Sequence, residues 1–148
     1  MTQDNITVKI INESGMDLPG YATEYSAGMD LRAAIATPVT LQPLERRLIP
    51  TGLRIELPAG YEMQIRPRSG LALKHGISLV NTPGTIDADY RGEIGVILIN
   101  LSDQAYTIQP GERIAQMVAA AYARVSWQTV DSLAASERGE GGFGHTGK

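Results

Sequence analysis

Residues 53–66 read LRIELPAGYEMQIR, and this stretch decides how the rest of the chain is interpreted. Apolar and polar residues alternate on both sides of a Pro-Ala-Gly break at residues 58–60. A period of two is typical of half-buried β-strands, because successive side chains point to opposite faces of a sheet. Proline and glycine between two such runs indicate a turn. The stretch therefore predicts two short strands with a turn between them.

The same pattern recurs elsewhere along the chain. Residues 6–10 alternate between apolar and polar, and residues 94–99 (IGVILI) are apolar throughout, which predicts a strand buried on both faces. Prolines and Pro-Gly pairs interrupt the chain at short intervals. Frequent short strands with such turns suggest a β-sandwich or barrel, so we predict an all-β fold.

Two segments could be helix or strand. Leu71–His75, followed by Gly76, is compatible with one short helical turn that ends at a glycine cap. Residues 114–122 contain helix-forming alanines, but they follow a Pro-Gly turn and lie among strands. We therefore predict a strand there, because periodicity alone does not distinguish the two structures.

Composition excludes several classes of protein. The chain has 148 residues, which fits a single domain, and 43% of them are hydrophobic, too many for a disordered protein. With no cysteine and two histidines, it offers neither a thiol nucleophile nor the ligands of a typical zinc site. A net charge of −3 argues against a nucleic-acid partner, but a small anion could still bind beside local arginines.

We expect a cytoplasmic protein without a membrane partner. The start, MTQDN, lacks a secretory signal, and no apolar run approaches the roughly 20 residues of a membrane helix. Only 5% of the residues are aromatic, so the core must be built from aliphatic side chains and methionine. The apolar strands exceed the interior of one small monomer, which favours an oligomer.

Five clusters combine glycine with charged or polar groups. They are residues 27–31 (AGMDL), 66–72 (RPRSGLA), 81–93 (NTPGTIDADYRGE), 111–117 (GERIAQM) and 138–147 (RGEGGFGHTG). In the second cluster, Arg68, Ser69 and Gly70 could cradle an anion, because a forked cation, a hydroxyl and accessible backbone N–H groups occur together. The alternative is a solvated arginine at the end of a strand.

The third cluster suggests the tip of a hairpin. Its glycine and two acids favour a turn, and β-branched Thr85 and Ile86 favour a strand as the first arm. Asp87 could be functional or could only cap backbone N–H groups. Tyr90 could form the wall of a pocket. Asn81, which both donates and accepts hydrogen bonds, could read a base edge or only shape the turn.

The remaining clusters leave two interpretations each. Gln116 would be a lone polar group in an apolar segment, either a core amide with a partner or a functional group, and Asp30 is equally ambiguous. The glycine-rich tail is either disordered or a flap that closes on a ligand. In the second case Phe143 could stack on a base and Arg138 could contact a phosphate.

In this order, the five clusters resemble the five motifs of the trimeric deoxyuridine triphosphatases (dUTPases, dUTP diphosphatases). RPRSGLA, GTIDADYRGE and GGFGHTG are nearly intact, and His145 stands where many members have serine. The resemblance implies a jelly-roll-like dUTPase β-barrel over residues 1–137 and a flexible glycine-rich arm over residues 138–148. It also implies a homotrimer with shared active sites, each closed by the arm of a neighbour.

The resemblance further implies a hydrolase that converts dUTP to dUMP and pyrophosphate with Mg²⁺, which supplies dUMP for thymidylate synthesis and keeps uracil out of DNA. Asp87 would be the general base for the water that attacks the α-phosphorus. Asp30 and Gln116 would hold the metal through water, because Mg²⁺ keeps several of its own waters.

The resemblance also implies which residues contact the other parts of the substrate. Uracil read by placed polar groups is distinguished from cytosine, and a tyrosine packed on deoxyribose leaves no room for a 2′-hydroxyl. The contacts to the phosphates are assigned to Arg68, Ser69, Gly70 and Arg138, and Gln116 is assigned as a further substrate-binding residue. The contacts to the nucleoside are assigned to Asn81, Thr85, Ile86, Tyr90 and Phe143.

Two other functions compete with this one. A dCTP deaminase of the same superfamily is disfavoured by the intact third cluster and the glycine-phenylalanine tail. Release of ammonia from dCTP would establish it. A non-enzymatic binding protein on the same fold would carry damaged motifs, and none of the five is damaged here.

Overall fold

The computed structural model describes residues 5–147 and contains eleven strands and one helix in that range. The helix α1 spans Ser69–His75. The strands are β1 (Lys9–Asn12), β2 (Gly28–Arg32), β3 (Val39–Leu41), β4 (Arg46–Pro50), β5 (Leu53–Glu56), β6 (Tyr61–Arg66), β7 (Ile77–Leu79), β8 (Gly84–Ile86), β9 (Gly95–Asn100), β10 (Tyr106–Ile108) and β11 (Arg113–Ala121). The predicted all-β class with one short helical turn is confirmed.

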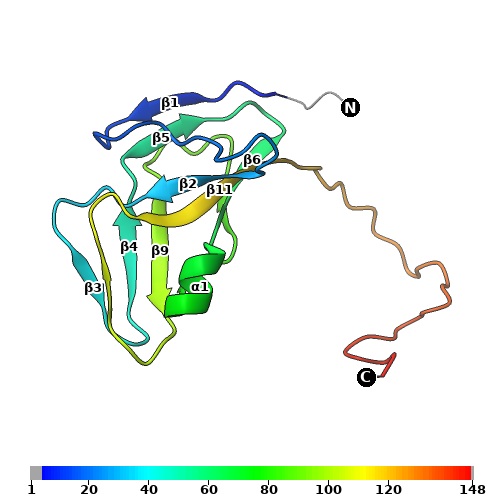
Figure 1. The fold of residues 1–148 in the computed structure, drawn as a ribbon. Coiled ribbons are helices and arrows are strands. Elements are labelled where there is room, and N and C mark those ends of the chain that lie inside the picture. Colours follow the sequence, from blue (N-terminus) through cyan, green and yellow to red (C-terminus); the bar gives the residue numbers. More distant parts are fainter. Residues whose placement is uncertain (1–4, 148) are drawn as a thin grey trace.

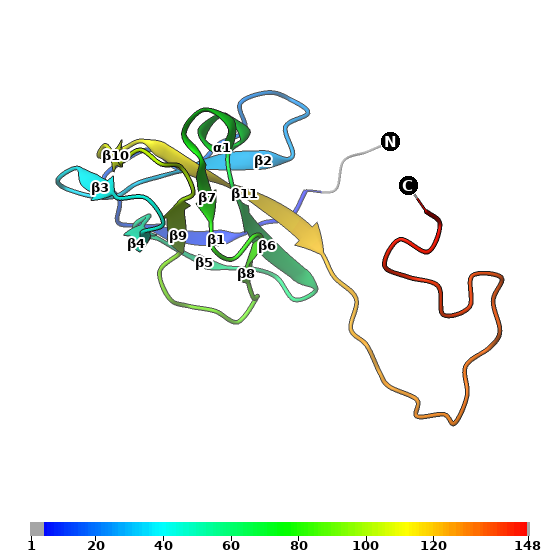
Figure 2. The ribbon, with the colours of Figure 1, turned by 90° about the horizontal axis from the view of Figure 1, so that it is seen from below.

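The strands form small antiparallel sheets around one core (Figures 1 and 2). A four-stranded sheet has the order β2-β11-β6-β8, and a three-stranded sheet has the order β4-β9-β7. Two further pairs are β1-β5 and β10-β3. Most paired strands are far apart in the sequence, which is expected of the jelly-roll-like fold that the resemblance implies.

The core consists of aliphatic side chains, as the low aromatic content predicts. The largest side chains that are almost completely buried are Leu31, Leu41, Ile49, Ile77, Ile94, Leu98, Ile108 and Ile114. Thr51 and Asn100 are buried with them. The Thr51 hydroxyl donates to the Ile94 carbonyl oxygen at 2.6 Å, and the Asn100 amide donates to the carbonyl oxygens of Leu41 and Gln104. The core therefore leaves neither polar side chain unpaired.

Both ambiguous segments adopt the structures predicted for them. α1 ends at Gly76, which has a φ of 65° and donates its N–H to the carbonyl oxygens of the last turn. The helix begins at Ser69, two residues before the predicted start. Lys74 and His75 in its last turn are placed favourably for the helix dipole. Residues 114–121 form most of β11, the predicted strand.

Burial of β9 differs from the prediction of a strand buried on both faces. Val96 and Leu98 are almost completely buried, whereas Ile97 and Ile99 on the other face are only partly buried in this chain. The prediction therefore holds for one face. The apolar residues of the second face remain accessible to another surface.

The predicted hairpin at Thr85 and Ile86 is wrong. The turn itself is present, because the Tyr90 N–H donates to the Asp87 carbonyl oxygen at 3.1 Å. However, β8 pairs with β6, and β9, the next strand along the chain, lies in the other sheet. The turn therefore connects two sheets. Local turn signals did not reveal this, since the partner of β8 lies more than one element away in the sequence.

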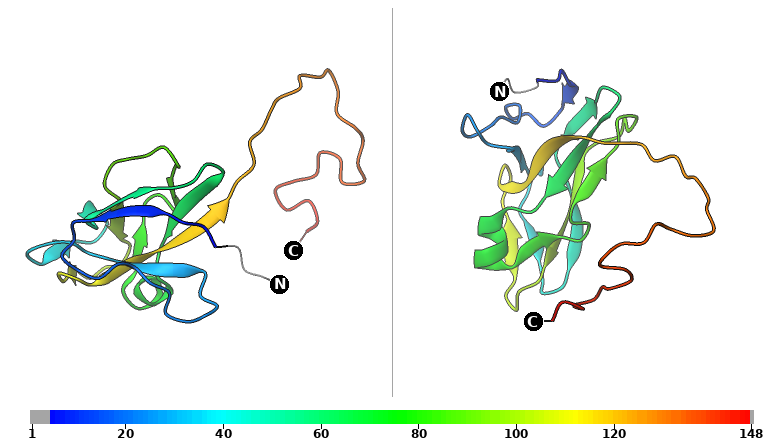
Figure 3. Two further views of the ribbon diagram at one scale, coloured as in Figure 1. Left: turned by 90° about the horizontal axis from the view of Figure 1, so that it is seen from above. Right: turned by 90° about the vertical axis from the view of Figure 1, so that its right-hand side faces the viewer.

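After Ala121 the chain leaves the sheets as an extended tail, coloured orange to red in Figure 1. Residues 122–140 are exposed, and the two views of Figure 3 show the tail beside the strands rather than on them. The domain boundary expected between residues 137 and 138 lies inside this tail and stays a prediction. In the described range, no helix is long and apolar enough to cross a membrane.

Candidate active site

Asp30 and Gln116 lie side by side on neighbouring strands. The pairing of β2 with β11 places Gln116 opposite Asp30, and both are partly buried. The Gln116 amide nitrogen donates to the Pro67 carbonyl oxygen at 3.0 Å. The amide oxygen faces Gly28, where an added Cβ would lie 2.7 Å from it. Glycine at position 28 therefore makes room for this oxygen beside the Asp30 carboxylate.

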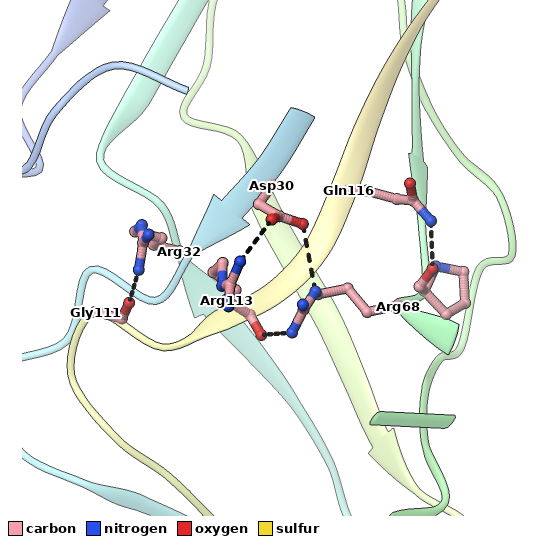
Figure 4. A network of polar contacts seen from close by, with 7 residues as sticks. Asp30, Arg32, Arg68, Gly111, Arg113 and Gln116 are labelled. Carbon is pink, nitrogen blue, oxygen red and sulfur yellow. Dashed lines mark hydrogen bonds and ion pairs between the residues drawn. The ribbon is translucent and has the colours of Figure 1, made fainter. Parts of the chain in front are cut away.

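Two arginines contact the Asp30 carboxylate from different sides (Figure 4). Arg68, which follows β6, brings Nε to 3.3 Å from Oδ1. Arg113, at the start of β11, brings a guanidinium nitrogen to 3.4 Å from Oδ2. Arg68 also donates to the Arg113 carbonyl oxygen at 3.2 Å. We call Asp30, Arg68 and Arg113 the arginine cluster; it carries one net positive charge.

Ser69 and Gly70 extend the arginine cluster along the chain. They are the first two residues of α1, directly after Arg68, and both are exposed. N–H groups in the first turn of a helix have no partner within the helix, so they are available to an anion. The anion cradle that the sequence suggested at Arg68, Ser69 and Gly70 thus lies next to Asp30 and Gln116.

Tyr106 of β10 lies near the arginine cluster. Burial is the main cause that raises the pKa of Tyr106 to about 12; its hydrogen bond to Glu112 acts in the same direction, and the charge of Arg68 opposes it. The hydroxyl donates to a Glu112 carboxylate oxygen at 3.0 Å. The Tyr106 ring also packs against His75 at a centroid distance of 4.9 Å. Tyr106 therefore remains a neutral hydrogen-bond donor near pH 7 and ties β10 to α1.

A second group of the predicted residues surrounds a cavity of about 340 Å³ beside the turn after β8. The Asp87 carboxylate is exposed at this cavity. Its lining combines acidic, aromatic and apolar side chains, the mixture that is typical of small-molecule sites. The lining residues are Leu48, Pro50, Thr85, Ile86, Asp87, Tyr90, Glu93, Gly95 and Ile97.

Close backbone approaches place Tyr90, which lines this cavity, and Asn81, which does not line it. The Tyr90 ring lies over Gly92 so closely that an added Cβ there would overlap the Tyr90 hydroxyl. That hydroxyl donates to the Glu93 carbonyl oxygen at 2.9 Å. The Asn81 amide nitrogen lies 3.0 Å from the position of an added Cβ at Gly84. Two glycines therefore allow Tyr90 and Asn81 to lie against the chain.

The two groups of residues are separate within one chain. A cavity of about 650 Å³ beside Asp30 and Arg113 shares no lining residue with the cavity at Asp87. β2 and β8 lie at opposite edges of their sheet. Among residues 5–147, no hydrogen bond or ion pair connects Asp87 or Tyr90 to the arginine cluster.

Arg138 and Phe143 lie on the tail, away from both groups. The Arg138 Nε donates to the Gly141 carbonyl oxygen at 2.6 Å, a contact within the tail itself. Phe143 has an exposed fraction of 114% and a positive φ of 51°. The only phenylalanine of the chain is therefore not part of the core.

Comparison with known proteins identifies the family. A family model described as dUTPase matches residues 3–147. The chain belongs to the dUTPase family. A deoxyuridine 5′-triphosphate nucleotidohydrolase from Fusobacterium nucleatum subsp. nucleatum is 58% identical over 143 residues, which cover 97% of this chain and 98% of the relative. The resemblance seen in the five clusters is confirmed.

Solved dUTPase structures have the same fold. The dUTPase of Staphylococcus bacteriophage 80alpha, solved with dUPNHPP, has a TM-score of 0.85 and 28% identity and covers 99% of this chain and 100% of its own. A mutant dUTPase from phage phi11 of S. aureus has a TM-score of 0.76 over 89% of this chain and 100% of its own. At 22% identity this second likeness shows the fold alone; that protein is described with a structural Mg(II) ion.

Sequence reasoning missed several residues that this dUTPase places at the two sites. Arg113 lies within the fourth cluster, but nothing in its sequence position showed that it contacts Asp30. Leu48 and Pro50 of β4 and Ile97 of β9 line the cavity at Asp87 without belonging to any cluster. No local signal marks them, because the pairing of β4 with β9 is not local in the sequence.

Proposed function

We infer that this dUTPase hydrolyses dUTP to dUMP and pyrophosphate. The observation that carries the inference is the family match over residues 3–147, supported by a 58% identical relative that is named for this substrate. The product would supply dUMP for thymidylate synthesis, and removal of dUTP would keep uracil out of DNA. Local arginines can bind an anionic nucleotide although the chain has a net charge of −3, and we expect the enzyme to act in the cytoplasm.

We propose that the cavity at Asp87 takes the nucleoside. The exposed Asp87 carboxylate would accept the proton of the water that attacks the α-phosphorus, since a carboxylate within hydrogen-bond reach of water can act as a general base. Asn81, Thr85 and Ile86 would recognise uracil. The Tyr90 ring, fixed over Gly92, would pack on the deoxyribose and exclude a 2′-hydroxyl.

We propose that the arginine cluster and the start of α1 take the phosphates. Arg68 would bind the phosphate chain through its forked guanidinium, and Ser69 and Gly70 would add a hydroxyl and backbone N–H groups. The Gln116 amide would be a further substrate-binding group at the phosphate end. One net positive charge is already present there, because two arginines share one carboxylate, and it would attract the anionic triphosphate.

Asp30 and Gln116 suit a Mg²⁺ ion held mainly by the substrate. Their oxygens lie on adjacent strands, and Gly28 leaves space beside the Gln116 oxygen. No group of three His, Cys, Asp or Glu side chains in the described range could enclose a metal. This donor set fits Mg²⁺, which keeps several waters and needs few protein ligands. When bound, the ion would neutralise charge on the triphosphate.

We propose that each active site is assembled from different copies of the chain in a homotrimer. One nucleotide needs both groups of residues, yet each chain keeps them separate. The partly buried apolar face of β9 offers a surface for such contacts. Residues 138–148 would form the arm of a neighbour, with Arg138 on the γ-phosphate and Phe143 over the uracil, while residues 1–137 would form the barrel domain.

Substrate preference tests the proposed reaction. Pyrophosphate release should be fast with dUTP and slow with dTTP, dCTP and UTP, each measured at equal concentration. Equal rates for dUTP and UTP would contradict the roles proposed for Tyr90 and its cavity. Ammonia release from dCTP, without pyrophosphate from dUTP, would contradict the reaction itself.

Mixed oligomers test the shared site. Asp87→Asn and Arg68→Ala each remove one half of the site, and each variant alone should be inactive. After the two variants are unfolded and refolded together, roughly one quarter of the sites should combine an intact Asp87 with an intact Arg68 from another copy. Activity that does not return in the mixture, although trimers form, would contradict the shared site.

A further inference from the structure

In the proposed phosphate site Arg113 contributes only positive charge, yet it contacts both other members of the arginine cluster. Its guanidinium donates to Asp30 Oδ2, and its backbone carbonyl oxygen accepts a hydrogen bond from Arg68 (Figure 4). Arg113 therefore touches both Asp30 and Arg68, which also contact each other at 3.3 Å. Half of the Arg113 side chain is exposed, so the contact is not explained by packing of the core.

A strand irregularity places Arg113 on the face where it meets Asp30. Gln116 and Asp30 are paired and share one face, and Arg113 precedes Gln116 by three positions. In a regular strand, residues three apart point to opposite faces. The register between β11 and β2 shifts between Arg113 and Ala115, so Arg113 pairs with Arg32 and returns to the face of Asp30. Such bulges re-aim side chains and occur beside active sites.

The two arginines hold Asp30 in different ways. The contact from Arg113 to Oδ2 has the geometry of a hydrogen bond as well as an ion pair. The contact from Arg68 to Oδ1 is an ion pair only, and the hydrogen bond of Arg68 goes to the Arg113 carbonyl oxygen instead. Within residues 5–147, Asp30 is the only partner of the Arg113 guanidinium, whereas the Arg68 guanidinium is divided between Asp30 and the Arg113 carbonyl oxygen. Arg113 is therefore the arginine dedicated to the carboxylate.

We propose that Arg113 is a positioning residue that keeps Asp30 in place while Arg68 transfers from Asp30 to the phosphates of the substrate. The proposal rests on the roles proposed above for Asp30 and Arg68. When Arg68 leaves, Oδ1 loses its cation and becomes free to accept a hydrogen bond from a metal-bound water. Arg113 remains on Oδ2, so the carboxylate does not follow Arg68.

A double-mutant cycle tests this proposal by the affinity for the α,β-imido analogue of dUTP, measured by calorimetry with Mg²⁺ and with EDTA. With Mg²⁺, Arg113→Gln should weaken binding about tenfold. On an Asp30→Asn background the same substitution should add less than about threefold, because its effect acts through Asp30. Thermal unfolding and sedimentation check that every variant is folded and assembled.

Arg32→Gln is the matched control. Arg32 has the same charge, lies on the same face of β2 as Asp30, and donates to the Gly111 carbonyl oxygen instead of to Asp30. In EDTA, Arg113→Gln and Arg32→Gln should weaken binding equally, since only charge is lost. With Mg²⁺, Arg113→Gln should weaken binding more.

Three results would overturn the proposal. Equal losses of affinity from Arg113→Gln and Arg32→Gln with Mg²⁺ would show that Arg113 contributes only its positive charge. An undiminished loss on the Asp30→Asn background would show that Arg113 acts without Asp30. In both cases the proposed roles of Asp30 and Arg68 would stand. If Asp30→Asn alone leaves Mg²⁺-dependent binding unchanged, the role of Asp30 fails as well, and the two failures are thereby distinguished.

Discussion

The two halves of the candidate site are held together by different forces. The phosphate half consists of the arginine cluster with Ser69, Gly70 and Gln116. There, charged side chains contact each other: Asp30 contacts two arginines, and the charges are partly exposed. The nucleoside half is the cavity at Asp87. There, side chains contact the backbone: the Tyr90 hydroxyl donates to a carbonyl oxygen, and the ring lies over Gly92. If a nucleotide binds as proposed, the phosphate half would exchange partners, whereas the nucleoside half would keep its shape.

This difference suits the two parts of the substrate. Solvent-exposed ion pairs contribute about 0–1 kcal/mol each, and the pairs of Asp30 are partly exposed. Replacing Asp30 by a phosphate as the partner of Arg68 would give a new ion pair, so the exchange should cost little. A cavity that must distinguish sugars and bases needs fixed walls, because a pocket that deforms accepts the wrong ligand. The following substitutions test whether the two halves contribute independently, the phosphate half by exchanging ion-pair partners and the nucleoside half by its fixed shape.

Asp87→Asn should have the largest effect on catalysis. It removes the proposed base from the nucleoside half and leaves the walls of the cavity and the whole phosphate half in place. We expect kcat for dUTP to fall by roughly 10³ or more, with the affinity for the imido analogue kept within a few-fold. Single-turnover kinetics and calorimetry measure the two quantities. A near-normal rate would remove Asp87 from the chemistry.

Removal of residues 138–148 should have the next largest effect. If the two halves are insufficient without the tail, kcat should fall by about 10², because a site open to water loses both the stacked ring and the arginine on the γ-phosphate. Sedimentation should still show the parent assembly. Phe143→Ala is the narrower companion variant and should cost less. Full activity without the tail would contradict the proposed arm.

Arg68→Lys should weaken the phosphate half alone. Lysine keeps the charge but loses the forked geometry, so the affinity for the triphosphate analogue should fall about tenfold while that for deoxyuridine is unchanged. Arg66→Lys is the matched control, because Arg66 lies two residues earlier and contacts Gln64. An equal loss for both nucleoside and triphosphate would show that the halves are not independent.

Gly92→Ala should have the smallest effect, and it should appear in specificity. The added methyl group forces the Tyr90 ring away from its position, so the preference for dUTP over UTP in kcat/KM should fall several-fold, about 1 kcal/mol. Tyr90→Phe keeps the ring and loses only the bond to Glu93, so it should change the preference less. An unchanged preference for dUTP over UTP in Gly92→Ala would show that Tyr90 does not recognise the sugar.

Local sequence signals were sufficient for several elements of the fold. The glycine at position 76 and the Pro-Gly turn before β11 marked the helix and the last long strand, because caps and turns depend on neighbouring residues. The hairpin at residues 85–87 was predicted wrongly because strand pairing is not local. Ile86 pairs with Met63, which no nearby residue indicates.

The candidate site was predictable in its residues but not in its arrangement. Five clusters with family-like spacing named Asp30, Arg68 and Asp87, and their roles remain predictions. Their division into two separate groups depends on the order β2-β11-β6-β8, which emerges only when the sheet is assembled. The contact of Arg113 with Asp30 depends on a register shift against β2. Single-sequence periodicity carries no information about such a shift.

The extended tail after Ala121 determines how far Phe143 can reach from the strands. At about 3.3 Å per residue, residues 122–143 can span roughly 70 Å, several times the radius of gyration of about 14 Å for a domain of this size. Reach alone therefore does not decide which site Phe143 covers. A tethered ring acts at an effective concentration on the order of millimolar, so a contact with a Kd of about 1 mM, roughly 4 kcal/mol, would be half occupied, and a weaker one less. The same weakness would let the ring depart quickly when product leaves.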